Sequence, residues 1–324
     1  MMVKRGCVLL FVLAASAPMV FAQEEPTYAE RLGWPKGSRV IMFHCDDAGM
    51  SHGQNQGAIK ALEYGILTSV STMMACPWVS QFAAYLEDHP EVDNGLHLTL
   101  TSEWTHYRWG PVAGKAAVPG LVDKQGCLWP NVMGVVMNAT ADEVETEIRA
   151  QIDRAETLGI PITHLDTHMG TVYAKPEFLE RYIKIGIEKQ IPIMIMAGHM
   201  TWTKKSEPEA VERLQPEKLG ETVWNGGLPV LDDLLNETYG WKSFEEKKAN
   251  TIKALRELKP GITMIIVHCA QPTEEWPIFT SSSETRLNDL KLMTDPDLKK
   301  VIEEEKLILT TWREMMERRK QVKE

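Results

Sequence analysis

Short runs of apolar and β-branched residues alternate along the chain with segments in which apolar residues recur every three to four positions. The runs predict strands and the segments between them predict amphipathic helices. We expect strands at residues 39–44, 68–75, 93–100, 162–166, 191–196, 262–268 and 307–310. We expect helices at residues 54–63, 79–87, 140–158, 177–189 and 244–258. Repeated strand and helix units indicate an α/β fold with a parallel sheet. About seven strands in one series suit an irregular TIM-like (β/α) barrel in a single domain.

Residues 101–138 interrupt this alternation. They contain Trp104, Trp109 and Trp129 among several glycines and prolines, and they show no sustained period. A long irregular insertion in a compact domain is usually functional. Exposed tryptophan faces stack well on sugar rings, but packing in a core is the commoner role of any single tryptophan.

The composition is that of an ordinary globular protein, with 44% hydrophobic and 25% charged residues among 324. The 22 glycines and 18 prolines are too few for a fibrous or mainly disordered chain. The formal net charge is −10 and no run of basic residues forms a phosphate-binding face, so nucleic acid is not expected as a partner. The sequence predicts no oligomeric state.

The first 22 residues resemble a signal peptide. Lys4 and Arg5 precede a short apolar stretch, and Val20-Phe21-Ala22 ends in the small-residue pattern that signal peptidase accepts. The stretch is too short for a membrane anchor, which needs about 20 apolar residues, and Pro18 breaks it. We therefore expect an exported, periplasmic or secreted protein with a mature domain at residues 23–324 and no membrane anchor.

Four cysteines follow this leader, at positions 45, 76, 127 and 269. They form no CxxC pair and are too few for a disulfide scaffold. A buried free thiol is expected for Cys76. Cys45 and Cys269 each adjoin a candidate catalytic residue, so we expect them to lie near each other.

Two adjacent carboxylates, Asp46 and Asp47, follow the first predicted strand after Cys45, and Gly49 after them permits a sharp turn. A strand's carboxyl end is where barrel enzymes place their chemistry, and the pair suits a metal ligand beside a general base. In extended backbone the two side chains would point apart, so both can serve one site only if the chain turns there. An isolated Asp-Asp more often forms an Asx turn or a helix cap.

A second polar cluster contains His164, Asp166 and His168. Pro161 and the β-branched residues around it argue for a strand, whose period of two places these three side chains on one face. Polar groups directed into a barrel need partners, which a metal ion or a satisfied hydrogen-bond network could supply.

Two further histidines lie on predicted strands. His97 interrupts an alternating strand, where alone it would be a core histidine, and His268 ends a buried apolar run. Asp or His at four strand ends is improbable as coincidence, so these positions predict one site at the carboxyl end of the barrel.

Three motifs resemble those of the YdjC-like carbohydrate deacetylases, in the same order and at similar spacings. They are Asp46-Asp47-Ala48-Gly49, Gly95-Leu96-His97-Leu98-Thr99-Leu100-Thr101 and His164-Leu165-Asp166-Thr167-His168. The resemblance covers roughly residues 39–270. It implies an irregular barrel of parallel strands and metal-dependent removal of acetyl groups from N-acetylated sugars such as chitooligosaccharides.

The resemblance also implies roles for individual residues. Asp46 resembles the general base, Asp47, His97 and His168 resemble the ligands of one divalent metal ion, and His268 resembles a proton donor to the departing amine. One carboxylate and two imidazoles leave coordination positions open for water and substrate. This ligand set favours Zn²⁺ chemically, and the resemblance also admits Mg²⁺.

We expect the Asp166 carboxylate to fix the orientation of a metal-binding imidazole. The ring nitrogen that does not bind the metal usually donates its N–H to a carboxylate or carbonyl. The chain departs from the family where further histidines often follow, with Gly170 and Val172 in their place. An arginine common on the next strand is replaced within residues 193–196.

Three alternatives remain at this stage. The first is an amide or ester hydrolase with the same site and a non-sugar substrate. The second is a catalytically silent carbohydrate-binding protein, against which the presence of both Asp46 and Asp47 argues. The third is a structural or interaction protein, and the sequence has no heptads, repeats or long charged arms to support it.

Overall fold

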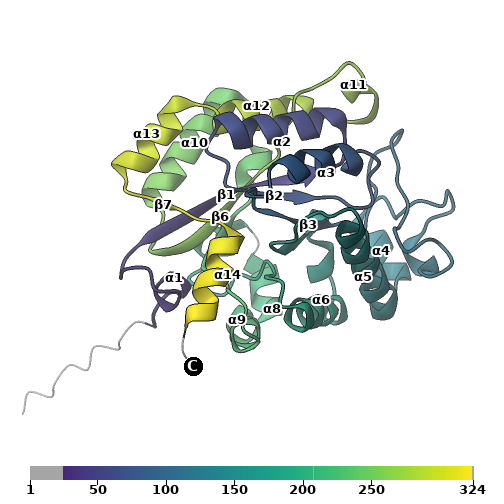
Figure 1. Ribbon diagram of the computed structural model, residues 1–324, viewed down its shortest axis with the longest axis horizontal. Coiled ribbons are helices and arrows are strands. Elements are labelled where there is room, and N and C mark those ends of the chain that lie inside the picture. The colour runs from purple at the N-terminus through teal and green to yellow at the C-terminus, as the bar shows by residue number, and fades with distance from the viewer. Residues whose placement is uncertain (1–24, 207, 323–324) are drawn as a thin grey trace, which may run out of the picture.

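The computed structural model describes residues 25–206 and 208–322, and it shows a curled parallel sheet with helices packed outside it (Figure 1). The strands are β1 Arg39–Ala48, β2 Ser69–Thr72, β3 Asn94–Leu98, β4 Leu165–Thr167, β5 Asp233–Leu235, β6 Gly261–Val267 and β7 Ile308–Leu309. Their order is β4-β3-β2-β1-β6-β5, and β7 pairs with β1. The predicted α/β class with a parallel sheet is confirmed. The predicted single domain at residues 23–324 stays a prediction.

The long central pair β1 and β6 forms the middle of this sheet. Their register runs from Arg39 opposite Gly261 to Cys45 opposite Val267, and β6 is buried along its whole length. Strands buried on both faces consist of near-continuous apolar runs, which is the pattern that made both strands predictable.

The two edges of the sheet, β4 and β5, are linked by residues 192–197. Ile193 forms an isolated bridge with Leu165 of β4, and Met196 forms one with Leu231, two residues before β5. The sheet therefore curls into an irregular barrel. The predicted strand at residues 191–196 is wrong as a regular strand, because Pro192 has no N–H to donate and only single bridges form on either side.

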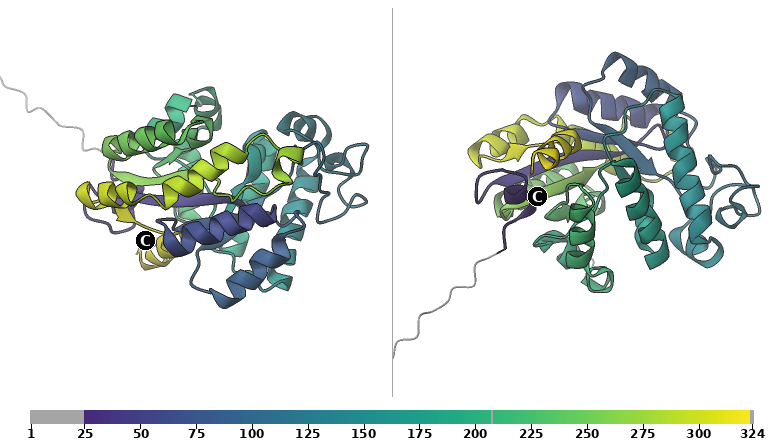
Figure 2. Two further views of the ribbon diagram at one scale, coloured as in Figure 1. Left: turned by 90° about the horizontal axis from the view of Figure 1, so that it is seen from above. Right: turned by 60° about the horizontal axis from the view of Figure 1, so that its bottom comes forward.

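The helices lie in two groups on the outside of the sheet (Figures 1 and 2). Above it in Figure 1 lie α2 His52–Tyr64, α3 Val79–Asp88, α10 Phe244–Glu257, α12 Ser283–Met293 and α13 Pro296–Glu304. Below it lie α5 Ala141–Thr157, α6 Pro176–Lys189, α8 Pro208–Leu214, α9 Pro216–Asn225 and α14 Trp312–Gln321. The remaining short helices are α1 Tyr28–Arg31, α4 Val132–Asn138, α7 Thr201–Ser206, α11 Trp276–Phe279, and the 3₁₀ segments η1 Pro119–Leu121, η2 His168–Tyr173 and η3 Glu237–Gly240.

The capping box expected at the start of α5 is present. The Thr140 hydroxyl accepts from the Glu143 N–H, and the Glu143 carboxylate accepts from the Thr140 N–H at 2.8 Å. Helix α5 also anchors the irregular insertion, because the buried Glu147 carboxylate accepts the N–H groups of Val112 and Ala113 at 2.9 Å each.

The insertion at residues 101–138 contains only η1 and α4 as regular helix. Trp104 and Trp109 are buried, as the packing interpretation expects, and Trp104 stacks on Phe279 of α11. No helix in the described chain combines the length and apolarity needed to span a membrane.

The four described cysteines are free. Cys76 is buried, as predicted, and burial holds its thiol pKa well above the usual value. The Cys269 N–H donates to Cys45 Sγ at 3.3 Å, so the predicted proximity of these two residues is confirmed.

Candidate active site

The Asp46 and Asp47 carboxylates turn toward one buried site at the carboxyl end of β1. Asp47 has a φ of 70°, a left-handed conformation that breaks the alternation of the strand. As a result Asp46 Oδ2 lies 3.7 Å and Asp47 Oδ1 lies 3.3 Å from the same atom, His97 Nε2 on β3. The turn that the sequence required for a shared site is therefore present.

Asp47, His97 and His168 converge on one point. Asp47 Oδ1 lies 3.3 Å from His97 Nε2 and 3.3 Å from His168 Nδ1, and the two ring nitrogens are 3.2 Å apart. All three residues are buried. They form one of three groups among the described residues that could hold a metal ion.

These atoms fit a divalent ion. Three ligand atoms about 2.0–2.2 Å from a tetrahedral ion stand about 3.3–3.6 Å apart, close to the separations observed here. Asp47 Oδ1 is buried without a hydrogen bond of good geometry, and two imidazole nitrogens face each other beside it. A cation would supply a partner for Asp47 Oδ1 and could coordinate both ring nitrogens, which otherwise have each other as partner.

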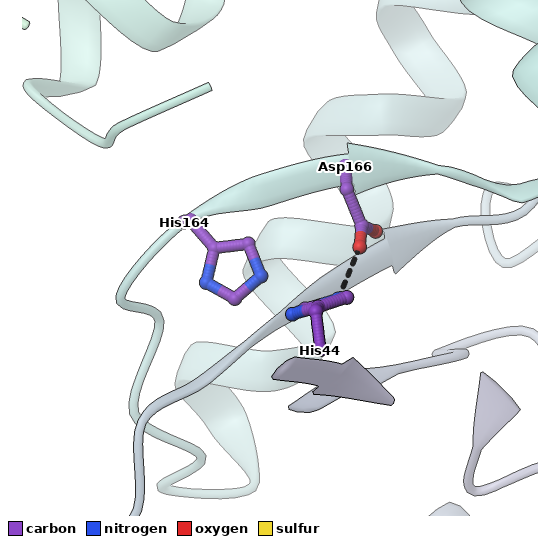
Figure 3. A group of neighbouring side chains, drawn as sticks. All are labelled: His44, His164 and Asp166. Carbon is purple, nitrogen blue, oxygen red and sulfur yellow. Dashed lines mark hydrogen bonds and ion pairs between the residues drawn. The ribbon is translucent and has the colours of Figure 1, made fainter. Parts of the chain in front are cut away.

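Asp166 of β4 lies behind His97 and connects it to a further histidine. Its Oδ1 is 2.7 Å from His97 Nδ1, and its Oδ2 is 2.7 Å from His44 Nε2 (Figure 3). With Nδ1 engaged by the carboxylate, His97 directs Nε2 toward Asp47. His44 was missed by the sequence analysis. Its Nε2 also lies 3.3 Å from Asp46 Oδ1, so this ring contacts one carboxylate on its own strand β1 and one on β4.

His164 lies apart from the Asp47, His97 and His168 cluster. Its ring stacks on Trp312 at a centroid distance of 5.2 Å and meets the His44 ring edge-on at 4.9 Å. A Cβ on Gly95 would come within 2.4 Å of the ring, so glycine is needed at that position for His164 to pack. Burial lowers the pKa of His164 well below its usual value, which keeps the ring neutral.

Two charged residues complete the site without belonging to any motif. Glu103, in the loop after β3, places Oε2 3.1 Å from His168 Nε2. Arg286 on α12 places Nη1 2.6 Å from Asp47 Oδ2. Glu103 follows the His97 strand closely in the sequence, and this position was the one sequence signal that could have suggested it as a site residue. Arg286 had none, since 239 residues separate it from Asp47.

The two adjacent aspartates have opposite pKa shifts. Burial raises the pKa of Asp46 to about 7, with Asp166 adding to the effect and His97 opposing it. Burial also acts on Asp47, but the Arg286 guanidinium and the His168 and His97 rings hold its pKa well below the usual range. Paired groups whose pKa values are driven apart can take different roles, one exchanging protons and the other remaining charged.

His268 lies across from Asp46 at the end of β6. Its Nε2 is 3.7 Å from Asp46 Oδ2, its backbone N–H donates to Asp289 Oδ2, and Tyr239 meets its ring edge-on. Burial, followed by the Arg286 charge, lowers the pKa of His268 well below its usual value. A ring with so low a pKa is neutral in the free protein. The role of proton donor that the resemblance implies for His268 stays a prediction.

Asp46 and His268 form one wall of a cavity of about 380 Å³. The other walls come from η2, residues 194–196, the helices α7 to α9, β5 and β6. The cavity places open space directly against the two side chains that could move protons.

The fold and the site define a parallel α/β barrel with a buried carboxylate and imidazole centre at its carboxyl end. The chain belongs to the YdjC-like protein family, whose model matches residues 40–304. A carbohydrate deacetylase of Thermus thermophilus is 32% identical over 89% of this chain and 97% of its own length. A chitooligosaccharide deacetylase of Yersinia enterocolitica is 26% identical over 82% of this chain and 95% of its own length.

A solved structure supports the same fold. A protein from Enterococcus faecalis V583, described as a candidate cellobiose-phosphate cleavage protein, superimposes with a TM-score of 0.70 at 20% identity. The match covers 85% of this chain and 98% of that one. At this identity the likeness bears on the fold alone.

The prediction of an exported protein is wrong. The carbohydrate deacetylases of Thermus thermophilus and Thermoanaerobacter pseudethanolicus match 89% and 85% of this chain over 97% and 98% of their own lengths, and these relatives do not support export. The prediction of export depended on a basic start and a short apolar run, which together involve few residues. An alignment over nearly the whole length of the relatives is stronger evidence. The signal peptide predicted at residues 1–22 lies outside the described residues.

Proposed function

We propose that this protein is a metal-dependent hydrolase that removes acetyl groups from N-acetylated sugars or oligosaccharides. One observation carries the proposal: Asp47 Oδ1, His97 Nε2 and His168 Nδ1 lie 3.2–3.3 Å from one another beside a second, protonatable carboxylate, Asp46. The names of the Thermus and Yersinia relatives supply the substrate class.

Asp47, His97 and His168 would hold a single divalent ion. Two nitrogen donors and one oxygen donor favour Zn²⁺ or another transition ion over Mg²⁺, which prefers oxygen. The bound ion would supply a more acidic water and a positive charge near the developing oxyanion. Asp166 fixes the orientation of His97, and Glu103 that of His168, through their second ring nitrogens.

Asp46 accepts a proton from the attacking water. Its pKa of about 7 suits this role, because a base works best when its pKa lies near the operating pH. The water oxygen bonds to the acetamide carbon, the C–N bond breaks, and the amine nitrogen takes up a proton. Since His268 is neutral in the free protein, it must first receive the proton, and Asp46 Oδ2 at 3.7 Å is the nearest source.

The proposal is tested by metal analysis of the purified protein combined with acetate release from a substrate panel. The panel contains N-acetylglucosamine, chitobiose, chitotriose, a non-sugar acetamide and an acetyl ester. We expect about one bound ion per chain and acetate from the sugars. Release from only the ester or the non-sugar amide would favour the non-sugar hydrolase. Sugar binding without any acetate release would indicate a silent carbohydrate-binding protein.

A further inference from the structure

The cavity beside Asp46 and His268 is lined mainly by flexible apolar side chains. The apolar members come from several parts of the fold: Met169, Ala174, Met194, Ile195, Met196, Met200, Val211, Leu214, Leu219, Leu234 and Ile266. Methionine is unbranched and adapts its shape to apolar ligands. Among the described residues that line the cavity there is no tryptophan, so they offer no indole face for stacking on a sugar ring.

Most of the polar side chains in this lining already have partners within the protein. The Thr203 hydroxyl donates to Asp233 Oδ1 at 3.1 Å, and the Thr167 hydroxyl accepts from the Val172 N–H at 3.3 Å. The Tyr173 hydroxyl donates to the Met194 carbonyl. The other polar lining residues are the exposed Arg213, Asn236, and Asp46 and His268 of the proposed site. A sugar ring held among the apolar side chains would lose water from its hydroxyl groups without gaining hydrogen bonds there, which is costly for buried polar groups.

The cavity is also much larger than an acetyl methyl group needs. A methyl group has about the size of one water molecule, roughly 30 Å³. It would fill about a tenth of the 380 Å³. Small-molecule sites of a few hundred Å³ normally bury most of their ligand.

We propose that this cavity binds an apolar acyl chain of the substrate, so that the preferred substrate is an amino sugar with an N-acyl chain of about six carbons. The proposal rests on the proposed function and extends it from the acetyl group to a longer acyl group cleaved at the same site. The water oxygen bonds to the acyl carbon, the C–N bond breaks, and the products are a fatty carboxylate and the free amino sugar. The sugar stays outside the cavity, where its hydroxyl groups remain near solvent.

The experiment measures kcat/KM of the full-length, Zn²⁺-supplemented protein on N-acetyl, N-butanoyl, N-hexanoyl and N-octanoyl glucosamine, by detection of the free amine. Each buried CH₂ contributes about fourfold, so hexanoyl should exceed acetyl by about tenfold or more even with partial burial. A second arm uses the octyl glycoside of N-acetylglucosamine, whose apolar chain is on the sugar side.

Three outcomes would overturn the proposal in distinguishable ways. Cleavage of the acetyl substrate with no gain for longer chains leaves the proposed function intact and removes the acyl-chain assignment. A gain for the octyl glycoside alone assigns the cavity to the sugar-side substituent. No cleavage at any chain length contradicts the proposed function as well.

Two variants on different walls test the cavity directly. Met196→Gln and Leu219→Gln keep the side chain similar in size but make the lining polar, and each should reduce the hexanoyl to acetyl ratio of kcat/KM about tenfold. Met133→Gln is the matched control, because Met133 is 64% exposed on α4 and does not line the cavity. An unchanged ratio in both cavity variants would overturn the assignment.

Discussion

The neighbouring residues Asp46 and Asp47 differ in their surroundings more than in their chemistry. Arg286 and two histidine rings surround Asp47, whereas Asp46 contacts His44 and faces the cavity. We therefore expect one carboxylate to move protons and the other to retain the ion.

Asp46→Asn should keep the metal and reduce kcat by about 10²–10⁴-fold, because a carboxamide keeps the shape but cannot accept the proton. Asp47→Asn should instead lower metal content. Turnover under saturating Zn²⁺ and metal analysis after dialysis measure the two effects. Near-normal turnover of Asp46→Asn would exclude it as the base. Metal loss from Asp46→Asn with retention in Asp47→Asn would reverse the two assignments.

Glu103 offers a second test at this scale. Its carboxylate engages the His168 nitrogen that faces away from Asp47, so Glu103→Gln should weaken metal affinity about 10–100-fold. Glu91→Gln is a matched control, because Glu91 contacts His89 in a similar pair on the exposed surface. Competition with a chelator measures both affinities, and equal values for the two variants would show that Glu103 does not support the ion.

The residues that sequence could identify were those that belong to local motifs. Asp47, His97 and His168 each lie at or near the end of a recognisable strand, and parallel strands bring such ends together. Their predicted roles remain predictions. Arg286 could not be found in this way, because it lies on a helix and nothing in its local sequence indicates a contact with Asp47, 239 residues earlier.

At the scale of elements, β1, β6 and α5 were predictable because their patterns are local: buried apolar runs and a capping box. Strand β5 was missed because Asp232 and Asp233 precede its apolar residues. Asp233 accepts the N–H groups of Trp202 and Thr203, so its polar character is satisfied by tertiary contacts that no local pattern reveals.

The Asp232 carboxylate connects helix α1 to β6 through hydrogen bonds. Its carboxylate accepts the N–H groups of Tyr28, Ala29 and Ile262 at 2.8–3.1 Å in a buried position. Asp232→Ala leaves three buried donors without partners, so we expect the free energy of unfolding to fall by about 2–4 kcal/mol. Urea unfolding followed by circular dichroism measures this loss. Asp153→Ala, on the exposed face of α5, should stay within about 0.5 kcal/mol of wild type, and a similar value for both would refute the role given to Asp232.

On the scale of the whole molecule, the site depends on chain segments that are distant in sequence. The proposed ion ligands come from β1, β3 and the start of η2, Arg286 comes from α12, and part of the cavity wall comes from α7 to α9. An ion bound between β1, β3 and η2 would stabilise the folded chain relative to the unfolded chain, in which these residues are far apart.

Metal removal should therefore lower the stability of the entire fold. At a Zn²⁺ concentration 100 times the Kd, the gain is about 2.7 kcal/mol, equivalent to about 4 °C in Tm for a chain of this length. Thermal unfolding with Zn²⁺ and with a chelator measures the difference.

The His168→Gln variant removes one proposed ligand and should lose most of the Zn²⁺-dependent shift in Tm. In the presence of chelator, the variant and the wild type should melt at similar temperatures. The surface variant His89→Gln should keep the shift. If His168→Gln shifts as much as wild type, Zn²⁺ binds elsewhere on the protein and the assigned ligand set is wrong.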